Sequence, residues 1–567
     1  MPLPARRPGW RYQPIVAALA AATLVTSGCT SSPTPGTTGT AAASSITIFN
    51  GATGTIVENW NPFSPTLLQP TGGVIYEPLY YFNLATQTPP KPMLATAYSW
   101  TPDGKQLTIT TRTGVTWSDG QPFSAKDVAF TFDLIRRTKA INASGLQITS
   151  ARATDDHTVV LTFPTTSFTS EASIIGNTPI IAEHVWSKIS DPAKTINPDP
   201  VGTGPYRLKS FSAQSYVLEK NPTYWQWGKP QIQTVRYIAL ATADAASAAL
   251  TAGQVDWMST FLPGLDKILK NQKELSYVNT PALTASIFTC AGAALGCKGP
   301  QTDPSVRQAI YNAISRDQLN KLAGGGFAET ASPTLLLPNR DQKWITDQAD
   351  LTTPGGPDVA RANQILDQAG WVKGADGIRA KGGERLSLTI QTVTGWSDFI
   401  SLNDAMTQEL KQIGIELKPT QLAWNEWNNN EVQGKFQLSL DSIGLGASAN
   451  PYFTYNPRYS TVTTAKVGES ASANGNFARY SNPAVDKAIT AAAATNDENV
   501  QKQQYAIIEG QIVRDLPYIP IYVNSMLTEF NTSRATGWPT NADKYALPAS
   551  WKQWDNGIVL TNLEPAK

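Results

Sequence analysis

The chain has 567 residues, of which 41% are hydrophobic and 16% charged, so it is long enough to form two or three lobes around sizeable cores. Its 45 basic and 44 acidic residues are evenly balanced, which argues against a polyanion-binding surface and excludes a nucleic-acid partner from our expectations. Two histidines are too few for most triad or zinc chemistry. We therefore expect no catalytic residues, no metal and no cofactor.

The N-terminal segment has the pattern of an export signal. Arg6, Arg7 and Arg11 precede the apolar run Ile15–Val25, which is too short to span a bilayer comfortably. Small residues before Cys29 resemble the bacterial lipobox, in which the cysteine receives a lipid, although Thr26 stands where leucine is usual. We expect residues 1–28 to be a lipoprotein signal peptide and Cys29 to be the lipidation site. An ordinary secretory signal cleaved nearby is the alternative.

Residues 29–45 consist almost entirely of Thr, Ser, Pro, Gly and Ala. Such a segment cannot bury a core, so we predict a flexible tether. The protein is then extracytoplasmic, attached to the outer, periplasmic face of a bacterial cell membrane through the lipid anchor only. No later apolar stretch is long enough for a membrane helix.

Hydrophobic periodicity predicts a mixed α and β layout. Residues that alternate between apolar and polar predict strands at Ile46–Asn50, Lys105–Arg112, Thr158–Phe163, Ser387–Thr392, Glu416–Pro419 and Phe436–Ser442. Helical spacing is found at Ser124–Arg137, Asp303–Ala323, Val359–Ala369, Leu402–Gln412 and Val485–Ala494. Ser124 is the predicted N-cap of the first of these helices. The alternation of strands and helices in the second half predicts an α/β lobe.

Cys290 and Cys297 are the two cysteines left after Cys29. Outside the reducing cytoplasm we expect them to form a disulfide that staples a loop. A metal pair is the alternative, but no histidine lies nearby in the sequence.

Motifs of catalysis are missing from the sequence. His157 lies in a predicted turn and His184 in a helix-like segment, and we interpret both as structural or surface residues. Gly444–Ala449 superficially fits a dinucleotide-binding fingerprint, but Pro451 is a poor fit to the helix that should follow. We interpret this segment as a cleft loop or hinge. Two distant carboxylates could still converge for glycoside hydrolysis, so a secreted glycoside-processing enzyme is the rival class, although no acid pair can be named.

Leu94–Asp133 closely resembles the signature of family 5 extracytoplasmic solute-binding proteins of ABC importers, which include oligopeptide- and dipeptide-binding proteins. The matching elements include Asp103-Gly104, Trp117–Gly120 and Ala125–Val128. Further matches follow in order at Gly202–Tyr206, Asn221–Trp225, Ala249–Asp256, Val306–Ile310, Ala313–Arg316, Ala362–Gly370, Asn476–Tyr480, Pro483–Asp486 and Leu516–Pro520. The resemblance therefore covers nearly the whole mature chain. We interpret Trp117 as a core residue.

The resemblance implies an α/β periplasmic-binding-protein-like clamp of the class II type, with two α/β lobes and an appended α+β domain. Lobe I is expected at 46–88, 200–280 and 525–567, its appended domain at 89–199, and lobe II at 281–524. The implied partners are ABC permease subunits with their ATPases and a small-molecule ligand, bound by a monomer that is not an enzyme. Ligand binding would shift the population toward a closed clamp.

Peptide-binding members anchor the peptide's amino terminus with an aspartate in a segment that corresponds here to Gly446–Pro451. Both acidic positions are lost, to Ala447 and Asn450, so a buried ammonium would lack its charge partner unless Asp441 or Glu426 substitutes. The segment Thr528–Leu563 resembles the oligosaccharide-binding branch of the family. We therefore favour an oligosaccharide over a short peptide, and an oligopeptide- or dipeptide-binding protein remains the alternative.

Pyranose rings stack on indole planes, and their hydroxyls bind neutral amides. The candidate ligand-binding residues are accordingly aromatic residues and asparagines in predicted loops, namely Trp60, Asn61, Trp396, Trp424, Trp427, Asn450, Tyr452, Phe453, Tyr455 and Trp538.

Overall fold

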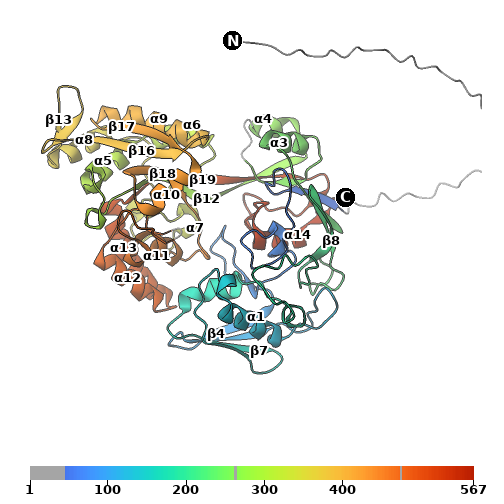
Figure 1. Ribbon diagram of the computed structural model, residues 1–567. Coiled ribbons are helices and arrows are strands. Elements are labelled where there is room, and N and C mark those ends of the chain that lie inside the picture. The colour runs from blue at the N-terminus through green and yellow to red at the C-terminus, as the bar shows by residue number, and fades with distance from the viewer. Residues whose placement is uncertain (1–44, 261–264, 473–474, 567) are drawn as a thin grey trace, which may run out of the picture. The chain divides into compact units, whose positions relative to one another are not determined.

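A computed structural model describes residues 45–260, 265–472 and 475–566 (Figure 1). The predicted signal peptide, Cys29 and the predicted tether up to residue 44 lie outside the described residues. Within the described ranges, no helix is both long and apolar enough to cross a membrane.

A ten-stranded mixed sheet runs through the molecule in the order β17-β16-β18-β12-β19-β11-β1-β10-β9-β8. Its strands are β1 (Ser45–Phe49), β8 (Tyr206–Ser212), β9 (Ser215–Lys220), β10 (Thr234–Ile238), β11 (Trp257–Met258), β12 (Leu275–Thr289), β16 (Ser387–Val393), β17 (Glu416–Leu422), β18 (Leu438–Ile443) and β19 (Tyr518–Asn531). The long antiparallel pair β12 and β19 joins the two ends of this sheet (Figure 1). One end of the pair contacts β11, and the other contacts β18.

The first lobe surrounds β1 and the hairpins that follow it. β1 pairs in parallel with β10, and β10 pairs with β9. A separate four-stranded sheet has the order β4 (Ala95–Trp100), β5 (Gln106–Thr111), β7 (Thr158–Thr162) and β6 (Ser150–Ala153). Helix α1 (Ala125–Arg137) packs on β6 and β7. It starts with a capping box in which Ser124 and Asp127 satisfy each other's backbone N–H groups. Trp117 is fully buried in the same hydrophobic core, as predicted.

The second lobe has two cores on opposite sides of its strands. The first packs beneath α5 (Pro304–Ala313), α6 (Arg316–Ala323), α8 (Val359–Gln368) and α9 (Ser397–Gln412). The second lies among α11 (Tyr452–Tyr459), α12 (Pro483–Ala493) and α13 (Glu498–Asp515). Between them, β16 pairs in parallel with β17 and β18, so the carboxyl ends of these three strands meet at one edge. Ligand sites in α/β proteins commonly lie at such an edge.

Smaller elements complete the fold. The remaining helices are α2 (Glu183–Trp186), α3 (Ala243–Thr251), α4 (Leu265–Asn271), α7 (Pro338–Asp341), α10 (Trp424–Gln433) and α14 (Gln553–Asn562). The remaining strands are β2 (Tyr80–Tyr81), β3 (Lys91–Pro92), β13 (Val372–Lys373), β14 (Arg379–Lys381), β15 (Glu384–Arg385), β20 (Ala535–Thr536) and β21 (Glu564–Pro565). The molecule is thus an α/β clamp with two lobes and an appended α+β domain.

Two local predictions are wrong. The single helix expected over Asp303–Ala323 is two helices, because Ile314 adopts an extended backbone and Ser315 starts a new turn. Trp424 and Trp427, expected in a loop, lie on α10. Asparagine-rich segments have low helix propensity, but this one ends in a regular cap at Gly434, which takes the left-handed conformation that glycine tolerates.

Candidate functional site

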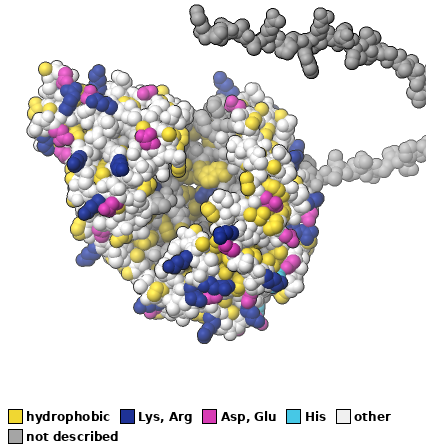
Figure 2. Space-filling view, viewed as in Figure 1, with side chains coloured by type: hydrophobic (Ala, Val, Ile, Leu, Met, Phe, Trp, Pro, Cys, Tyr) yellow, Lys and Arg dark blue, Asp and Glu magenta, His cyan; other side chains and the backbone are white. Residues whose placement is uncertain are grey.

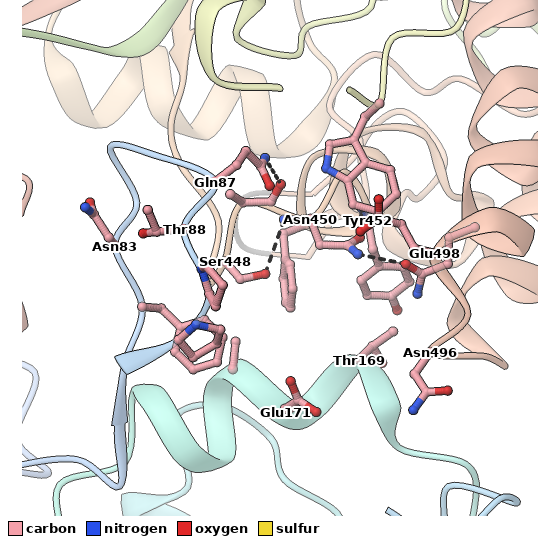
Figure 3. A pocket seen from close by; sticks show the side chains of 18 of the residues that line it. Asn83, Gln87, Thr88, Thr169, Glu171, Ser448, Asn450, Tyr452, Asn496 and Glu498 are labelled. Carbon is pink, nitrogen blue, oxygen red and sulfur yellow. Dashed lines mark hydrogen bonds between the residues drawn. The ribbon is translucent and has the colours of Figure 1, made fainter. Parts of the chain in front are cut away.

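A cavity of about 400 Å³ lies between the two lobes (Figure 3). Side chains from three regions line it. They are Phe82, Asn83, Thr86–Pro90, Phe168, Thr169, Glu171 and Ala172 from the first lobe and its appended domain, and Lys343, Trp344, Ser448, Ala449, Asn450, Tyr452, Phe453, Asn496, Glu498 and Gln501 from the second lobe. Figure 2 shows this side of the molecule hollowed, with hydrophobic side chains in the hollow and charges of both signs mixed on the outer surface. The lining combines aromatic rings with amides, hydroxyls and the charged side chains of Glu171, Lys343 and Glu498.

The loop after β18 forms one wall of this cavity. Asn450 holds the loop in place, because its Nδ2 donates to Gln501 Oε1 at 3.0 Å and its Oδ1 accepts from the Tyr505 hydroxyl and from Tyr452 N at 2.9 Å. Tyr452 and Phe453 follow on the first turn of α11 and present their rings to the same space. Ser448 and Ala449 line the cavity, so the segment Gly444–Ala449, which we interpreted as a cleft loop or hinge, lies at the cleft.

Gln87 bridges the lobes beside the cavity. Its Nε2 donates to Asp341 Oδ1 at 2.8 Å and to the Ala449 carbonyl at 2.9 Å. Figure 3 labels Gln87 at the edge of the cavity. A second bridge lies next to it, where Arg340 Nη1 donates to the Leu84 carbonyl at 3.0 Å. Polar contacts therefore join the first-lobe segment 82–90 to the second lobe.

The carboxylates nearest the cavity already have partners. Glu171 accepts from the Tyr98 hydroxyl at 2.9 Å and from Trp100 Nε1 at 2.8 Å, and burial raises its pKa. Asp341 is 1% exposed and pairs with Arg340 at 2.6 Å. Among the lining residues, this leaves Glu498.

Glu498 is shared between two lysines, with Lys343 at 2.8 Å and Lys502 at 3.3 Å. These contacts, the hydrogen bond from Lys343 first among them, lower its pKa. Asp341 and Glu498 are therefore paired with cations, whereas the partners of Glu171 are a phenol and an indole, which carry no charge.

A second cavity, of about 300 Å³, lies on the other side of the loop. It shares Phe82 with the first cavity and is otherwise lined by Leu84, Gly176, Asn177, Gly446, Ala447 and Trp551–Asp555. Trp551 is 42% exposed, so its indole is available for contact. Asp555 is buried beneath, where it accepts from the Tyr81 hydroxyl and from Leu547 N at 2.9 Å.

Four candidate residues are buried in the core and do not line either cavity. Trp60 is fully buried and packs edge-on against Tyr216, with ring centroids 5.2 Å apart. The Asn61 amide donates to two backbone carbonyls, of Pro192 and Thr195. Tyr455 is buried, and its hydroxyl donates to Glu509 Oε1. The ring of Trp538 stacks on that of Phe530, with ring centroids 4.6 Å apart. These residues belong to the cores of the lobes, and their assignment as ligand contacts is corrected accordingly.

Three tryptophans gather at the carboxyl ends of β16 and β17 without lining either cavity. Trp427 is buried and donates from Nε1 to Ser439 Oγ at 3.0 Å. Trp396 is half-buried and packs against Trp427, with ring centroids 5.1 Å apart. Trp424 is 54% exposed. Trp396 and Trp427 therefore form a structural pair, and Trp424 alone of the three presents its ring to solvent.

Neither acid considered as a replacement anchor lines a cavity. Asp441 lies beside the buried Glu431, and burial raises the pKa of Asp441 to about 6 and that of Glu431 well above its usual range. Ser442 N donates to Asp441 Oδ1, and Ser439 Oγ donates to Glu431 Oε1. Glu426 lies on α10, outside both linings.

Cys290 and Cys297 form a disulfide with Cα atoms 5.5 Å apart. In the described part of the chain, no group of three or more His, Cys, Asp or Glu side chains is arranged to hold a metal ion.

Sequence reasoning missed Gln87, Trp551 and Trp554. Gln87 lies in a segment without a motif. The two tryptophans lie within Thr528–Leu563, the segment that resembles the oligosaccharide-binding branch, so that resemblance was the signal that pointed to them.

The fold and the interlobe cavity define a two-lobed ligand-binding clamp. Residues 89–465 match the model of the bacterial extracellular solute-binding proteins, family 5, and the chain belongs to this family. The chain is 29% identical over 440 residues to Protein XP55 of Streptomyces lividans. The aligned region covers 76% of this chain and 75% of that protein. It is 25% identical to the glutathione-binding protein GsiB of Salmonella choleraesuis, covering 88% of this chain and 92% of the relative.

The solved structures agree with this assignment. An oligopeptide ABC transporter periplasmic binding protein of Thermotoga maritima superposes with a TM-score of 0.81 at 25% identity, over 92% of this chain and 99% of that one. A structure of that Thermotoga maritima protein with mannohexaose bound superposes with a TM-score of 0.73 at 26% identity, over 92% and 98% of the two chains.

Proposed function

We propose that this protein is the lipid-anchored substrate-binding protein of an ABC importer and that it captures a neutral oligosaccharide between its lobes. The permease subunits and their ATPases are its partners, it works as a monomer on the outer face of the cell membrane, and it catalyses no reaction. The lobe boundaries expected from the sequence, at residues 88, 199, 280 and 524, belong to the same proposal.

The observation that carries the ligand class is the engagement of the acids at the cavity. A peptide's ammonium loses its hydration on entering a closed clamp and needs a carboxylate in return. Glu171, Asp341 and Glu498 each have a partner already, and the cleft loop supplies Ala447 and Asn450 where peptide binders carry acids.

The uncharged polar groups and the aromatic rings of the cavity suit a neutral sugar. Hydroxyl groups can donate to and accept from the side chains of Thr88, Ser448 and Asn496, which Figure 3 shows around the cavity. The rings of Tyr452 and Phe453, with Trp551 on the far side of the loop, offer faces for pyranose C–H groups. The Thermotoga maritima protein with mannohexaose bound shows that this fold accommodates an oligosaccharide.

Peptide binding is the second candidate, because several relatives bear the names of oligopeptide- and glutathione-binding proteins. The two candidates are separated by a thermal-shift panel of cello-, chito- and manno-oligosaccharides against short peptides. Ligand at 100 times its dissociation constant adds about 2.7 kcal/mol to the free energy of unfolding. A shift with peptides and none with sugars would refute the sugar proposal, while sugar left intact after long incubation would exclude a hydrolase.

The anchor has its own test. Cys29→Ser should move the protein from the membrane fraction to the medium or the soluble extracytoplasmic fraction. Retention in the membrane would show that Cys29 is not the anchor, and it would leave the ligand assignment untouched.

A further inference from the structure

One tryptophan is presented to solvent far more completely than the others that the structure describes. Trp227 is 98% exposed, whereas the next most exposed, Trp424, is 54% exposed. Trp227 lies at the tip of a tight turn that is closed by a hydrogen bond from Lys229 N to the Gln226 carbonyl at 3.0 Å. Gly228 follows with φ at +76°, the left-handed conformation that such a turn requires and glycine supplies. The turn holds the indole outward.

The base of this turn is rigid. Trp225 Nε1 donates to both carboxylate oxygens of the buried Glu77, at 3.1 and 3.0 Å, and the Tyr224 hydroxyl donates to the same group. Gln226 Nε2 donates to the Tyr224 hydroxyl at 2.9 Å, and the Arg112 guanidinium stacks over the Trp225 ring at 4.1 Å. An exposed indole on such a base is a fixed feature of the surface.

One positive charge lies on the turn itself. Lys229 ends the turn, two residues after Trp227. The carboxylate of Glu77 faces inward to Trp225. On the outer side, Glu564 accepts from Gln231, four residues beyond Trp227. The tip therefore combines an indole with a lysine.

The chain enters the described fold close to this turn. Ser45, the first described residue, pairs with Thr234 of β10, and Trp227 precedes Thr234 by seven residues, which span at most about 24 Å. Cys29 precedes Ser45 by sixteen residues, which span at most about 55 Å. A lipid on Cys29 therefore keeps the Trp227 turn within reach of the bilayer.

We propose that the turn Gln226–Lys229 is a membrane-contacting site, in which Trp227 enters the headgroup region and Lys229 binds anionic phospholipid. Indoles favour the membrane interface, and lysines favour anionic headgroups. This inference rests on the proposed lipid anchor. Free in solution, one indole and one lysine bind weakly, but a tether raises the effective concentration of the bilayer at the turn. The contact would orient the clamp on the membrane.

The test uses the mature chain that begins at Cys29, with its Cys29 thiol coupled to maleimide lipid in vesicles of phosphatidylcholine with or without phosphatidylglycerol. Lipids brominated near the headgroup quench a tryptophan only on contact. We expect quenching in the wild type, none in Trp227→Phe and wild-type quenching in the matched control Trp424→Phe. Lys229→Gln should lower the equilibrium constant for contact on phosphatidylglycerol vesicles about fivefold.

Equal quenching in the wild type and Trp227→Phe, or no quenching in either, overturns the inference. An effect of Lys229→Gln that is the same on vesicles without phosphatidylglycerol overturns the assignment of anionic lipid. Maleimide coupling replaces natural lipidation, so these outcomes do not depend on whether the cell modifies Cys29. A sugar-induced thermal shift measured on the same coupled protein reports the proposed transport ligand separately. Trp227 is exposed, so its replacement should leave the unfolding midpoint unchanged.

Discussion

Replacement of Gln87 by alanine should open the clamp. The substitution removes two hydrogen bonds across the lobes, one to the Asp341 carboxylate, which pairs with Arg340, and one to the Ala449 carbonyl. A hydrogen bond to a charged group contributes about 1.5–3 kcal/mol and a neutral one about 0.5–1.5 kcal/mol. Gln87 is half-buried, so water recovers part of this sum. The bridged conformation should therefore lose about 2 kcal/mol relative to conformations without the bridge.

Loss of the Gln87 bridge should change both the shape of the protein and its affinity for ligand. If the ligand binds only the bridged conformation, 2 kcal/mol weakens its apparent affinity by up to about 30-fold. Small-angle X-ray scattering of Gln87→Ala should show a larger radius of gyration than the wild type. The matched control is Gln231→Ala, which removes a single exposed hydrogen bond to Glu564, remote from the cavities. Unchanged scattering and unchanged ligand affinity in Gln87→Ala would refute the view that this bridge stabilises the clamp.

Three further predictions concern stability and the site. Replacing Cys290 and Cys297 by serine should lower the free energy of unfolding by about 2 kcal/mol, since the disulfide closes a loop with a sequence separation of 7, and an unchanged denaturation midpoint would contradict this. Burial raises the pKa of Glu529 to about 8, so the folded state retains a proton that the unfolded state releases near pH 4.5. Stability should thus fall by at most about 1.4 kcal/mol per pH unit between these values, and Glu529→Gln should flatten that profile in chemical denaturation. Trp60→Ala should cost about 3–5 kcal/mol of stability as a core truncation, whereas Trp551→Ala should leave the melting temperature nearly unchanged and weaken sugar binding in calorimetry. Equal melting temperatures for the two variants would contradict the assignment of Trp60 to the core and Trp551 to the surface.

Local patterns were sufficient to predict most elements. Apolar alternation marks β5 and β7, and Ser124 with Asp127 marks the start of α1, because a capping box acts within one turn of helix. The break at Ile314 left no comparable sign, since no glycine or proline stands there. The disulfide was predictable from the spacing of its two cysteines and the compartment alone.

The site was predicted only in part. Asn450, Tyr452 and Phe453 follow a recognisable loop and do line the cavity. Trp60 and Asn61 occur in an equally polar, turn-rich segment, yet the folded chain buries them. A side chain's role depends on what packs over it from distant parts of the chain, and the sequence around Trp60 does not contain Tyr216. Gln87 meets Asp341 and Ala449 only when the lobes approach, so no local pattern marks it.

The central claim is that the cavity accepts an uncharged ligand because its acids are already engaged. Isothermal titration of the wild type and of Ala447→Asp, each with one oligosaccharide from the panel and one short peptide, tests it most directly, because Ala447 lines the second cavity and has no side-chain hydrogen bond to lose. Our account predicts that the wild type binds the sugar and not the peptide, and that the added carboxylate strengthens peptide binding. Tight binding of the peptide by the wild type, with no gain in Ala447→Asp, would contradict it.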